Sequence, residues 1–229
     1  MEPGDDDRVQ GSEPESAMSH VSARNRTEPF EERSDEDLIQ AVAQGERAAF
    51  ETLVRRHKAR LYSYLLRLLR DPTDAEEIAQ ETFVRAYVHA EKYRTVARFS
   101  TWLYTIATNL VRNRIRKQRS TPKLVSISWG RGEEEDGERY DIDLPDAKDL
   151  PDRTLEKQEI QRRVEQAIAR IPAKYREAFV LREVNHFSYE EIAAVTGLKL
   201  GTVRSRINRG RGHFRGIMEP LLQRKLEES

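Results

Sequence analysis

Arginine recurs at nearly every third place between Lys199 and Arg215, and no acidic residue interrupts this segment. Guanidinium groups hold phosphates and reach guanine edges, so the chemistry that this spacing offers is nucleic-acid binding. On a helix of about 3.6 residues per turn the segment has two faces. One carries Val203, Ile207, Gly210 and Phe214, and the other carries Gly201, Ser205, Asn208 and Gly212, edged by Arg204, Arg209 and Arg215. Small residues at the centre and long cations at the edges would let this helix lie in a DNA major groove.

A second basic segment, residues 109–119, also lacks acids and combines amides with arginines. Asn109 and Asn113 are one helical turn apart, with Arg112 and Arg116 beside them. Amide groups can hydrogen-bond base edges while guanidinium groups hold phosphates, so we expect this helix to contact nucleic acid as well. A solvated basic face is the plainer alternative for either segment, and charge alone would favour it.

The residues before the first segment supply the elements that would position it. Ser188-Tyr189-Glu190-Glu191 forms a capping box, with Ser188 as N-cap and Glu191 at the third helical position. Gly197 suits the left-handed residue that ends a helix, and the next helix follows after a few residues. This is the spacing of a helix-turn-helix, and it favours DNA binding over a solvated face.

The remainder of the chain predicts an all-α fold. Structure is expected to begin at Ser34, where residues 34–37 resemble a capping box with Asp in place of Glu. Apolar periodicity predicts further helices at 48–69, 73–90, 100–117, from Thr154 and over 175–184, with a loop at 93–99. Residues 1–33 have the composition of a disordered acidic tail, and residues 120–153 that of a flexible acidic linker between two small helical domains.

Composition excludes several classes of protein. Cysteine is absent, which excludes disulfides and cysteine-ligated zinc, and the mean hydropathy is −0.80. No Gly-rich phosphate loop, nucleophile motif or metal-ligand spacing occurs, and the five histidines are scattered. We therefore expect no catalytic residue, no metal and no cofactor. No apolar run approaches the roughly 20 residues of a membrane span, and no signal peptide is present, so a cytoplasmic location is expected.

Three stretches of the chain together resemble a known family. YEEIAAVTGLKLGTVRSRINRGRGHFR (189–215) strongly resembles the C-terminal helix-turn-helix of bacterial RNA polymerase sigma factors of the extracytoplasmic-function (ECF) class. DAEEIAQETFVRAY (74–87) and FSTWLYTIATNLVRNRIRK (99–117) resemble the two motif blocks of that family's N-terminal domain. The resemblance implies a region 2 helix bundle over 34–119, the linker at 120–153, and a region 4 helix-turn-helix domain over 154–226.

The resemblance also implies a function and its sites. Such a protein is not an enzyme: it binds core RNA polymerase, recognises the −35 promoter element with region 4 and opens DNA at the −10 element with region 2. The implied −35 residues are Lys199, Thr202, Arg204, Ser205, Arg206, Asn208, Arg209 and Arg211. The implied −10 residues are Tyr93, Phe99, Asn109, Arg112, Asn113 and Arg116. Asp74, Glu77, Gln80 and Glu81 would grip the clamp coiled coil of the largest polymerase subunit, and region 4 would meet the polymerase flap.

Two stretches depart from the family's pattern. The loop YRTVARF (93–99) occupies the place where relatives accept a base flipped out of the non-template strand. It lacks the Gly-Asp of many relatives, which leaves open which −10 base it accepts. Gly210 and Gly212 stand where relatives commonly carry Ala and Lys or Glu, and a helix-interior glycine costs on the order of 1 kcal/mol relative to Ala. The sequence therefore predicts that the end of this helix frays until DNA or polymerase orders it.

The spacing of the domains predicts a need for a scaffold. The linker of residues 120–153 spans only roughly 30–35 Å as a free coil, whereas promoter elements about 25 base pairs apart lie roughly 80 Å from each other. The free chain is expected to be a monomer, with its domains mobile or packed together and their DNA surfaces partly hidden.

Alternatives and regulation remain open at this point. The main rival is a helix-turn-helix repressor that dimerises on a palindrome. The family resemblance implies control by an anti-sigma factor, often membrane-anchored, over a stress or envelope-signal regulon. The acidic tail of residues 1–33 is a candidate internal inhibitor, and no small-molecule substrate is expected.

Overall fold

The computed structural model describes residues 29–120 and 151–227, so residues 1–28 of the predicted tail and 121–150 of the predicted linker lie outside the described residues. The ends of the predicted linker, residue 120 and residues 151–153, are helical. The fold is helical throughout the described part. Its helices are α2 (Asp35–Ala43), α3 (Arg47–Leu69), α4 (Pro72–Val88), the 3-10 helix η1 (Ala90–Lys92), α5 (Phe99–Ser120), α6 (Pro151–Arg170), α7 (Ala173–Glu183), α8 (Tyr189–Thr196) and α9 (Leu200–Glu227). The expected all-α class is confirmed, and no helix among the described residues is long and apolar enough to cross a membrane.

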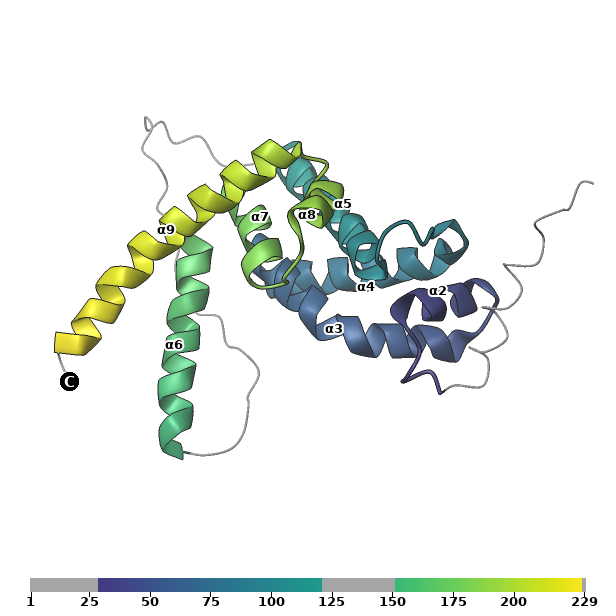
Figure 1. Cartoon of the computed structure of the whole chain (residues 1–229), viewed down its shortest axis with the longest axis horizontal. Coiled ribbons are helices and arrows are strands. Elements are labelled where there is room, and N and C mark those ends of the chain that lie inside the picture. Colours follow the sequence, from purple (N-terminus) through teal and green to yellow (C-terminus); the bar gives the residue numbers. More distant parts are fainter. Residues whose placement is uncertain (1–28, 121–150, 228–229) are drawn as a thin grey trace, which may run out of the picture.

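Helices α2–α5 form an N-terminal bundle around α3 (Figure 1). Its helices begin where short polar side chains cap them, since the Ser34 hydroxyl accepts from the Asp37 N–H and the Asp71 carboxylate accepts from the Asp74 N–H. Asp37 completes only half of the expected capping box, because its carboxylate accepts a hydrogen bond from the Ser34 hydroxyl rather than from the Ser34 N–H. Arg70, in the left-handed region at φ 61°, ends α3 just before Pro72 starts α4.

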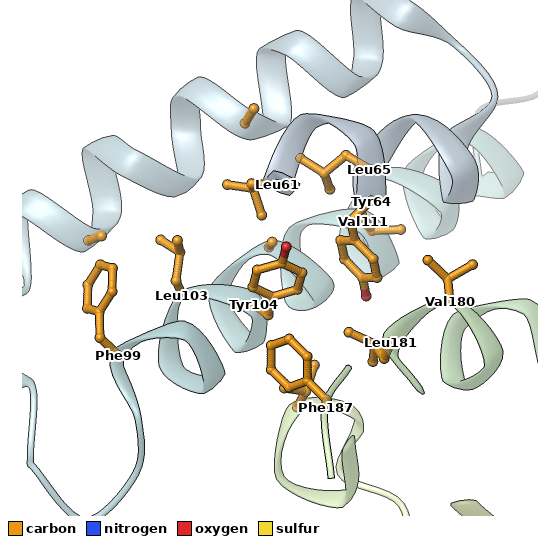
Figure 2. Close-up of a cluster of buried hydrophobic side chains, with 14 of the residues drawn as sticks. Leu61, Tyr64, Leu65, Phe99, Leu103, Tyr104, Val111, Val180, Leu181 and Phe187 are labelled. Carbon is orange, nitrogen blue, oxygen red and sulfur yellow. The ribbon is translucent and has the colours of Figure 1, made fainter. Parts of the chain in front are cut away.

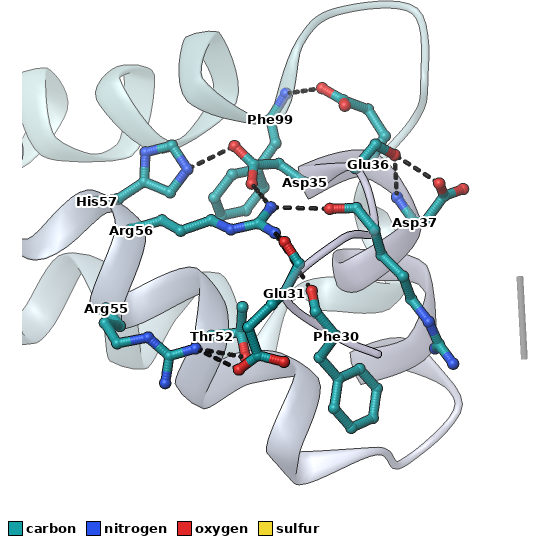
Figure 3. A network of polar contacts seen from close by, with 12 residues as sticks. Phe30, Glu31, Asp35, Glu36, Asp37, Thr52, Arg55, Arg56, His57 and Phe99 are labelled. Carbon is teal, nitrogen blue, oxygen red and sulfur yellow. Dashed lines mark hydrogen bonds and ion pairs between the residues drawn. The ribbon is translucent and has the colours of Figure 1, made fainter. Parts of the chain in front are cut away.

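The fold begins earlier than the sequence predicts. Residues 29–33, which the prediction placed in the disordered tail, form a turn against α3. The Arg56 guanidinium donates to the backbone carbonyls of Phe30, Glu31 and Arg33, and also to the Asp35 carboxylate (Figure 3). One half-buried arginine therefore satisfies carbonyls that the turn would otherwise leave without partners. Periodicity could not reveal this, because the donor lies more than 20 residues away along the chain.

Helices α6–α9 form a C-terminal bundle in which α9 packs mainly on α7. The predicted fraying of α9 is wrong: the helix continues through Gly210 and Gly212 to Glu227. Gly210 allows α9 to approach α7 closely, since a Cβ at this position would lie 2.9 Å from the Phe179 Cβ. The close packing against Phe179 compensates for the low helix propensity of the glycine.

The two bundles pack against each other through a shared apolar core. Figure 2 shows Tyr104 of α5 beside Phe187, which precedes α8, with Leu61, Tyr64 and Leu65 of α3 on the same cluster. The Tyr104 and Phe187 rings lie 5.0 Å apart, and the Asn185 amide donates to the Tyr104 hydroxyl at 3.0 Å. Of the two arrangements that the sequence allowed for the free domains, mobile or packed, the structure has the packed one.

A partly buried ion pair adds to this interface. The Arg67 guanidinium of α3 makes two hydrogen bonds to the Glu165 carboxylate of α6, at 3.0 and 2.5 Å. The two side chains are only 17% and 13% exposed, so the pair is far less screened than a surface ion pair. Arg176 of α7 reinforces the contact by donating to the Arg67 backbone carbonyl.

Candidate nucleic-acid interface

Helices α8 and α9 form the predicted helix-turn-helix. The Ser188 hydroxyl accepts from the Glu191 N–H, and the Glu191 carboxylate accepts from the Ser188 N–H, so the full capping box is confirmed. Gly197 ends α8 in the left-handed region at φ 67°, as the sequence predicts. Three residues later α9 begins, and its N-terminal turns are held against α8.

The rotation of α9 matches the prediction from its sequence. Val203 and Ile207 are fully buried, Gly210 is buried, and Phe214 packs against Phe179 with ring centroids 5.4 Å apart. The residues that the sequence placed on or beside the opposite face, Arg204, Ser205, Asn208 and Arg209, are exposed, and so is Lys199. Thr202, Arg206 and Arg211 are half-buried at the edges of that face.

Several of these side chains are already oriented by neighbours. The Arg209 guanidinium donates to the Tyr175 hydroxyl at 3.1 Å, and the His213 ring stacks on Tyr175 at 5.6 Å. The hydrogen bond from Arg209, with a further one from Lys174, lowers the pKa of the Tyr175 hydroxyl. Arg211 binds the Glu183 carboxylate of α7 at 2.7 and 3.0 Å, so part of its hydrogen-bonding capacity is used within the fold.

The amides and arginines predicted on α5 share one exposed surface. Asn109, Arg112, Asn113 and Arg116 are all exposed, and the Arg116 guanidinium donates to the Asn113 amide oxygen at 3.0 Å. Tyr93 and Phe99 are different, because they are 7% and 0% exposed and pack in an aromatic cluster with Trp102. The structure therefore brings four of the six predicted −10 residues together on the surface and places the other two beneath the loop that they flank.

Arg112 connects this surface to the C-terminal bundle. Its guanidinium donates to the Thr196 carbonyl at 2.9 Å and to the Glu177 carboxylate at 3.3 and 3.4 Å. Burial raises the pKa of the Glu177 carboxyl, and the charge and hydrogen bond of Arg112 offset part of that rise. Thr196 is the last residue of α8, so the basic face of α5 lies against the start of the helix-turn-helix turn.

The acids predicted on α4 form a surface that an arginine partly neutralises. Glu77, Gln80 and Glu81 are exposed, while Asp74 is half-buried. Arg114 of α5 donates to the Asp74 carboxylate at 2.7 Å and also to the Glu77 carboxylate. These acids raise the pKa of the Arg114 guanidinium further, with the Glu77 hydrogen bond as the largest cause. The sequence does not reveal this role of Arg114, because its partners lie on another helix.

The described residues contain no cluster of three or more His, Asp or Glu side chains that could hold a metal ion. The candidate binding surfaces among these residues are two exposed basic faces, on α5 and on the start of α9, and one acidic face on α4. These surfaces can bind polyanions and a basic protein partner.

Comparisons with known proteins show which family the chain resembles. Residues 53–121 match the family model for sigma-70 region 2, and residues 161–214 match that for sigma-70 region 4. The chain is 34% identical over 194 residues to the RNA polymerase sigma-H factor of Pseudomonas aeruginosa, covering 84% of this chain and 97% of that protein. It is 36% identical over 183 residues to the ECF RNA polymerase sigma factor SigW of Bacillus subtilis, covering 80% and 96%.

Solved structures share the fold at lower identity. CnrH, solved in complex with the cytosolic domain of CnrY, superposes with a TM-score of 0.57 at 23% identity, covering 82% of this chain and 99% of that one. RpoE of Bartonella quintana, solved with the anti-sigma factor NepR, gives a TM-score of 0.56 at 21% identity, covering 74% and 96%.

Proposed function

The chain belongs to the family of ECF RNA polymerase sigma factors, and from that premise we propose that it loads core RNA polymerase onto promoters through the surfaces described above. The family's members are transcription initiation factors rather than enzymes. In this proposal the N-terminal bundle is region 2, the C-terminal bundle is region 4, and residues 121–150, between α5 and α6, are the linker.

The observation that carries the proposal is the outward face of α9. Arg204, Ser205, Asn208 and Arg209 project from a helix whose Val203 and Ile207 anchor it firmly in the core. A rigid helix with short polar residues between arginines can enter a major groove and contact base edges and phosphates together. This face would read the −35 element, with Lys199, Thr202, Arg206 and Arg211 supporting it at the edges.

The exposed face of α5 would bind the −10 element as a single strand. Asn109 and Asn113 supply amides for base edges, while Arg112 and Arg116 supply cations for the backbone. Tyr93 and Phe99 would shape the adjoining loop from below, since both are buried.

Core polymerase would have to separate the two bundles. In the free chain, Arg112 of α5 is 2.9 Å from the carbonyl that ends α8, whereas promoter elements about 25 base pairs apart lie roughly 80 Å from each other. The acidic face of α4, Asp74, Glu77, Gln80 and Glu81, would bind the clamp coiled coil, and region 4 would bind the flap. Holding the bundles at promoter spacing would also release Arg112 for DNA.

The direct test is strand opening with and without core polymerase. On a promoter carrying both elements, permanganate should detect unpaired thymines near −10 only when this chain and core polymerase are both present. Opening or footprinting of a palindrome by the chain alone would instead favour the dimeric repressor.

For regulation, we propose a protein inhibitor of the anti-sigma type that competes with polymerase for the acidic face of α4. The proposed regulon is one of stress or envelope signals, and the proposed location is the cytoplasm, at the nucleoid when active and at the membrane when the inhibitor is membrane-anchored. A pull-down from uninduced cells that recovers polymerase subunits and no inhibitor would overturn this part of the proposal.

A further inference from the structure

Helix α2 has no role in the function proposed so far, yet two acids in its first turn are directed at the base of the 93–99 loop. Figure 3 shows Asp35 and Glu36 reaching toward His57 and Phe99, which lie on α3 and at the start of α5. The partners are 22 and 63 residues away in sequence, so these contacts tie three separate elements together.

Glu36 caps the helix that follows the loop. Its Oε1 accepts a hydrogen bond of 2.9 Å from the Phe99 N–H, and Phe99 is the first residue of α5. The first turn of a helix has N–H groups without intrahelical acceptors, and a carboxylate there is also favoured by the helix dipole. The first turn of α5 contains no acid of its own. The Thr101 hydroxyl in this turn is buried and has no hydrogen-bond partner, so the Thr101 side chain does not supply the cap.

Asp35 fixes the surface on which Phe99 rests. Its carboxylate binds His57 Nε2 at 2.6 Å and Arg56 Nη1 at 2.7 Å, and the His57 ring packs edge-on against Phe99 at 5.3 Å. Burial alone would raise the pKa of the Asp35 carboxyl, but the hydrogen bonds from His57 and Arg56 outweigh it and hold this pKa below its usual value. Asp35 is therefore ionised at neutral pH and keeps both partners in place.

The other end of the loop is closed by Tyr93. Its ring packs against Phe99 and Trp102, and its hydroxyl donates to the Ala97 carbonyl at 2.7 Å. Burial, with the charges of Glu36 and Asp35, raises the pKa of Tyr93 to about 12, so the hydroxyl remains a donor. Residues 94–98 are consequently fixed at both ends while remaining exposed, and Val96 at the tip is 95% exposed.

We propose that Glu36 is a positioning residue for promoter opening: through the Phe99 N–H it holds the exposed 94–98 loop where that loop meets an unpaired base of the −10 element. The inference rests on the proposed function. Glu36 touches no DNA itself; it acts by fixing where α5 begins and, with it, where the loop ends. Asp37 lies in the same turn of α2, but among the bonds described it contacts only Ser34. A substitution of Asp37 therefore tests whether any loss comes from general weakening of α2 rather than from the contact with Phe99.

The test uses the full chain bound to core polymerase and compares Glu36→Ala with Glu36→Gln and with the matched control Asp37→Ala. Glu36→Gln retains a carbonyl oxygen that can accept from Phe99, whereas Glu36→Ala retains none. Opening is followed by permanganate, and base discrimination by competition among −10 single strands that carry each of the four bases at each position. Core affinity and −35 duplex affinity are measured in parallel.

We expect Glu36→Ala to lower opening by about tenfold, the loss expected when a hydrogen bond to a charged acceptor is removed. Base discrimination should fall at one −10 position and persist at the others, while Glu36→Gln and Asp37→Ala remain within about twofold of wild type. Core and −35 affinities should not change.

A purely structural role would give a different pattern. Equal losses in Glu36→Ala and Asp37→Ala, or a loss of discrimination spread evenly over the element, would overturn the inference. If the wild-type chain with core polymerase failed to open the promoter, the proposed function would fall and this inference with it. Normal opening by wild type and by Glu36→Ala alike would reject the inference alone.

Discussion

At the residue scale, the two glycines of α9 have opposite environments. A Cβ at Gly210 would lie 2.9 Å from the Phe179 Cβ, whereas nothing lies within 4 Å of a Cβ at Gly212. We predict that Gly212→Ala stabilises the fold by about 0.5–1 kcal/mol through helix propensity. Gly210→Ala should destabilise it by about 1–3 kcal/mol, because the clash involves an atom close to the backbone. Urea unfolding of the two variants checks the signs, and stabilisation by both would show that α9 can move away from α7.

The arginines of α9 should carry sequence readout. Arg204→Ala and Arg209→Ala are each expected to cost about 1–3 kcal/mol in binding to a −35 duplex and to relax preference at one base pair. The measurement is holoenzyme binding to duplexes with single base-pair changes. Arg163→Ala is the matched control, because Arg163 is paired with Glu159 on α6, away from the exposed face of α9. Wild-type affinity in both α9 variants would refute the assignment.

Burial of Glu177 predicts a pH dependence of stability. The pKa of its carboxyl is raised from the usual 4.5, so the folded state binds this proton more tightly than the unfolded state does. Its contribution to the free energy of unfolding is therefore full below about pH 4.5 and is lost as the pH rises through the raised pKa. Glu177→Gln should lack this component. Urea unfolding of both proteins from pH 4.5 upward gives the difference, and parallel curves would contradict the prediction.

At the scale of elements, one face of α5 is proposed to bind the −10 strand and the other face anchors the helix in the core. Mutation should separate these two roles. Asn109 and Asn113 are exposed one turn apart, whereas Leu103 and Ala107 anchor the same helix in the core. Replacing both asparagines by alanine should abolish opening at −10 while core and −35 affinities stay at wild-type values. Thermal unfolding serves as the control, since alanine at exposed helix positions should not lower stability. A loss of all three activities together would indicate a folding defect instead.

The sequence predicts elements well where the signal is local. The capping box of Ser188 and Glu191, the end of α8 at Gly197 and the buried stripe of α9 depend on residues within a few turns of each other. The cap of Phe99 by Glu36, the pairing of Arg114 with Asp74 and the contact of Gly210 with Phe179 join residues far apart in the sequence. Helical periodicity does not encode such pairs. For the same reason, the sequence could not show that Tyr93 and Phe99 are buried under their loop.

At the scale of the whole molecule, the packing of the two bundles predicts a closed free state that can be opened by mutation. Arg67→Ala leaves the Glu165 carboxylate half-buried without its partner and should weaken the interface by about 1.5–3 kcal/mol. The chain has no cysteine, so dyes on Lys58→Cys and Gln166→Cys can report the distance between the bundles by energy transfer. We expect a longer distance and tighter binding of −10 single strands without polymerase.

The surface pair of Arg163 and Glu159 again gives the control, since Arg163→Ala should cost no more than about 0.5 kcal/mol and leave the distance unchanged. An unchanged distance in Arg67→Ala as well would mean that the apolar contact of Tyr104 with Phe187 holds the bundles without help from the ion pair.

In the proposed function, closure of the two bundles and promoter binding both use the guanidinium group of Arg112. If strand binding requires Arg112 to leave the Thr196 carbonyl, closure and strand binding weaken each other by the same factor, as reciprocal linkage requires. The apparent affinity for an unpaired strand then equals the intrinsic affinity scaled by the open fraction. The strength of one interdomain contact thereby sets how much free factor is diverted to stray single-stranded DNA. Substitutions at Glu177, which also accepts a hydrogen bond from Arg112, would change the open fraction without altering any residue proposed to contact DNA.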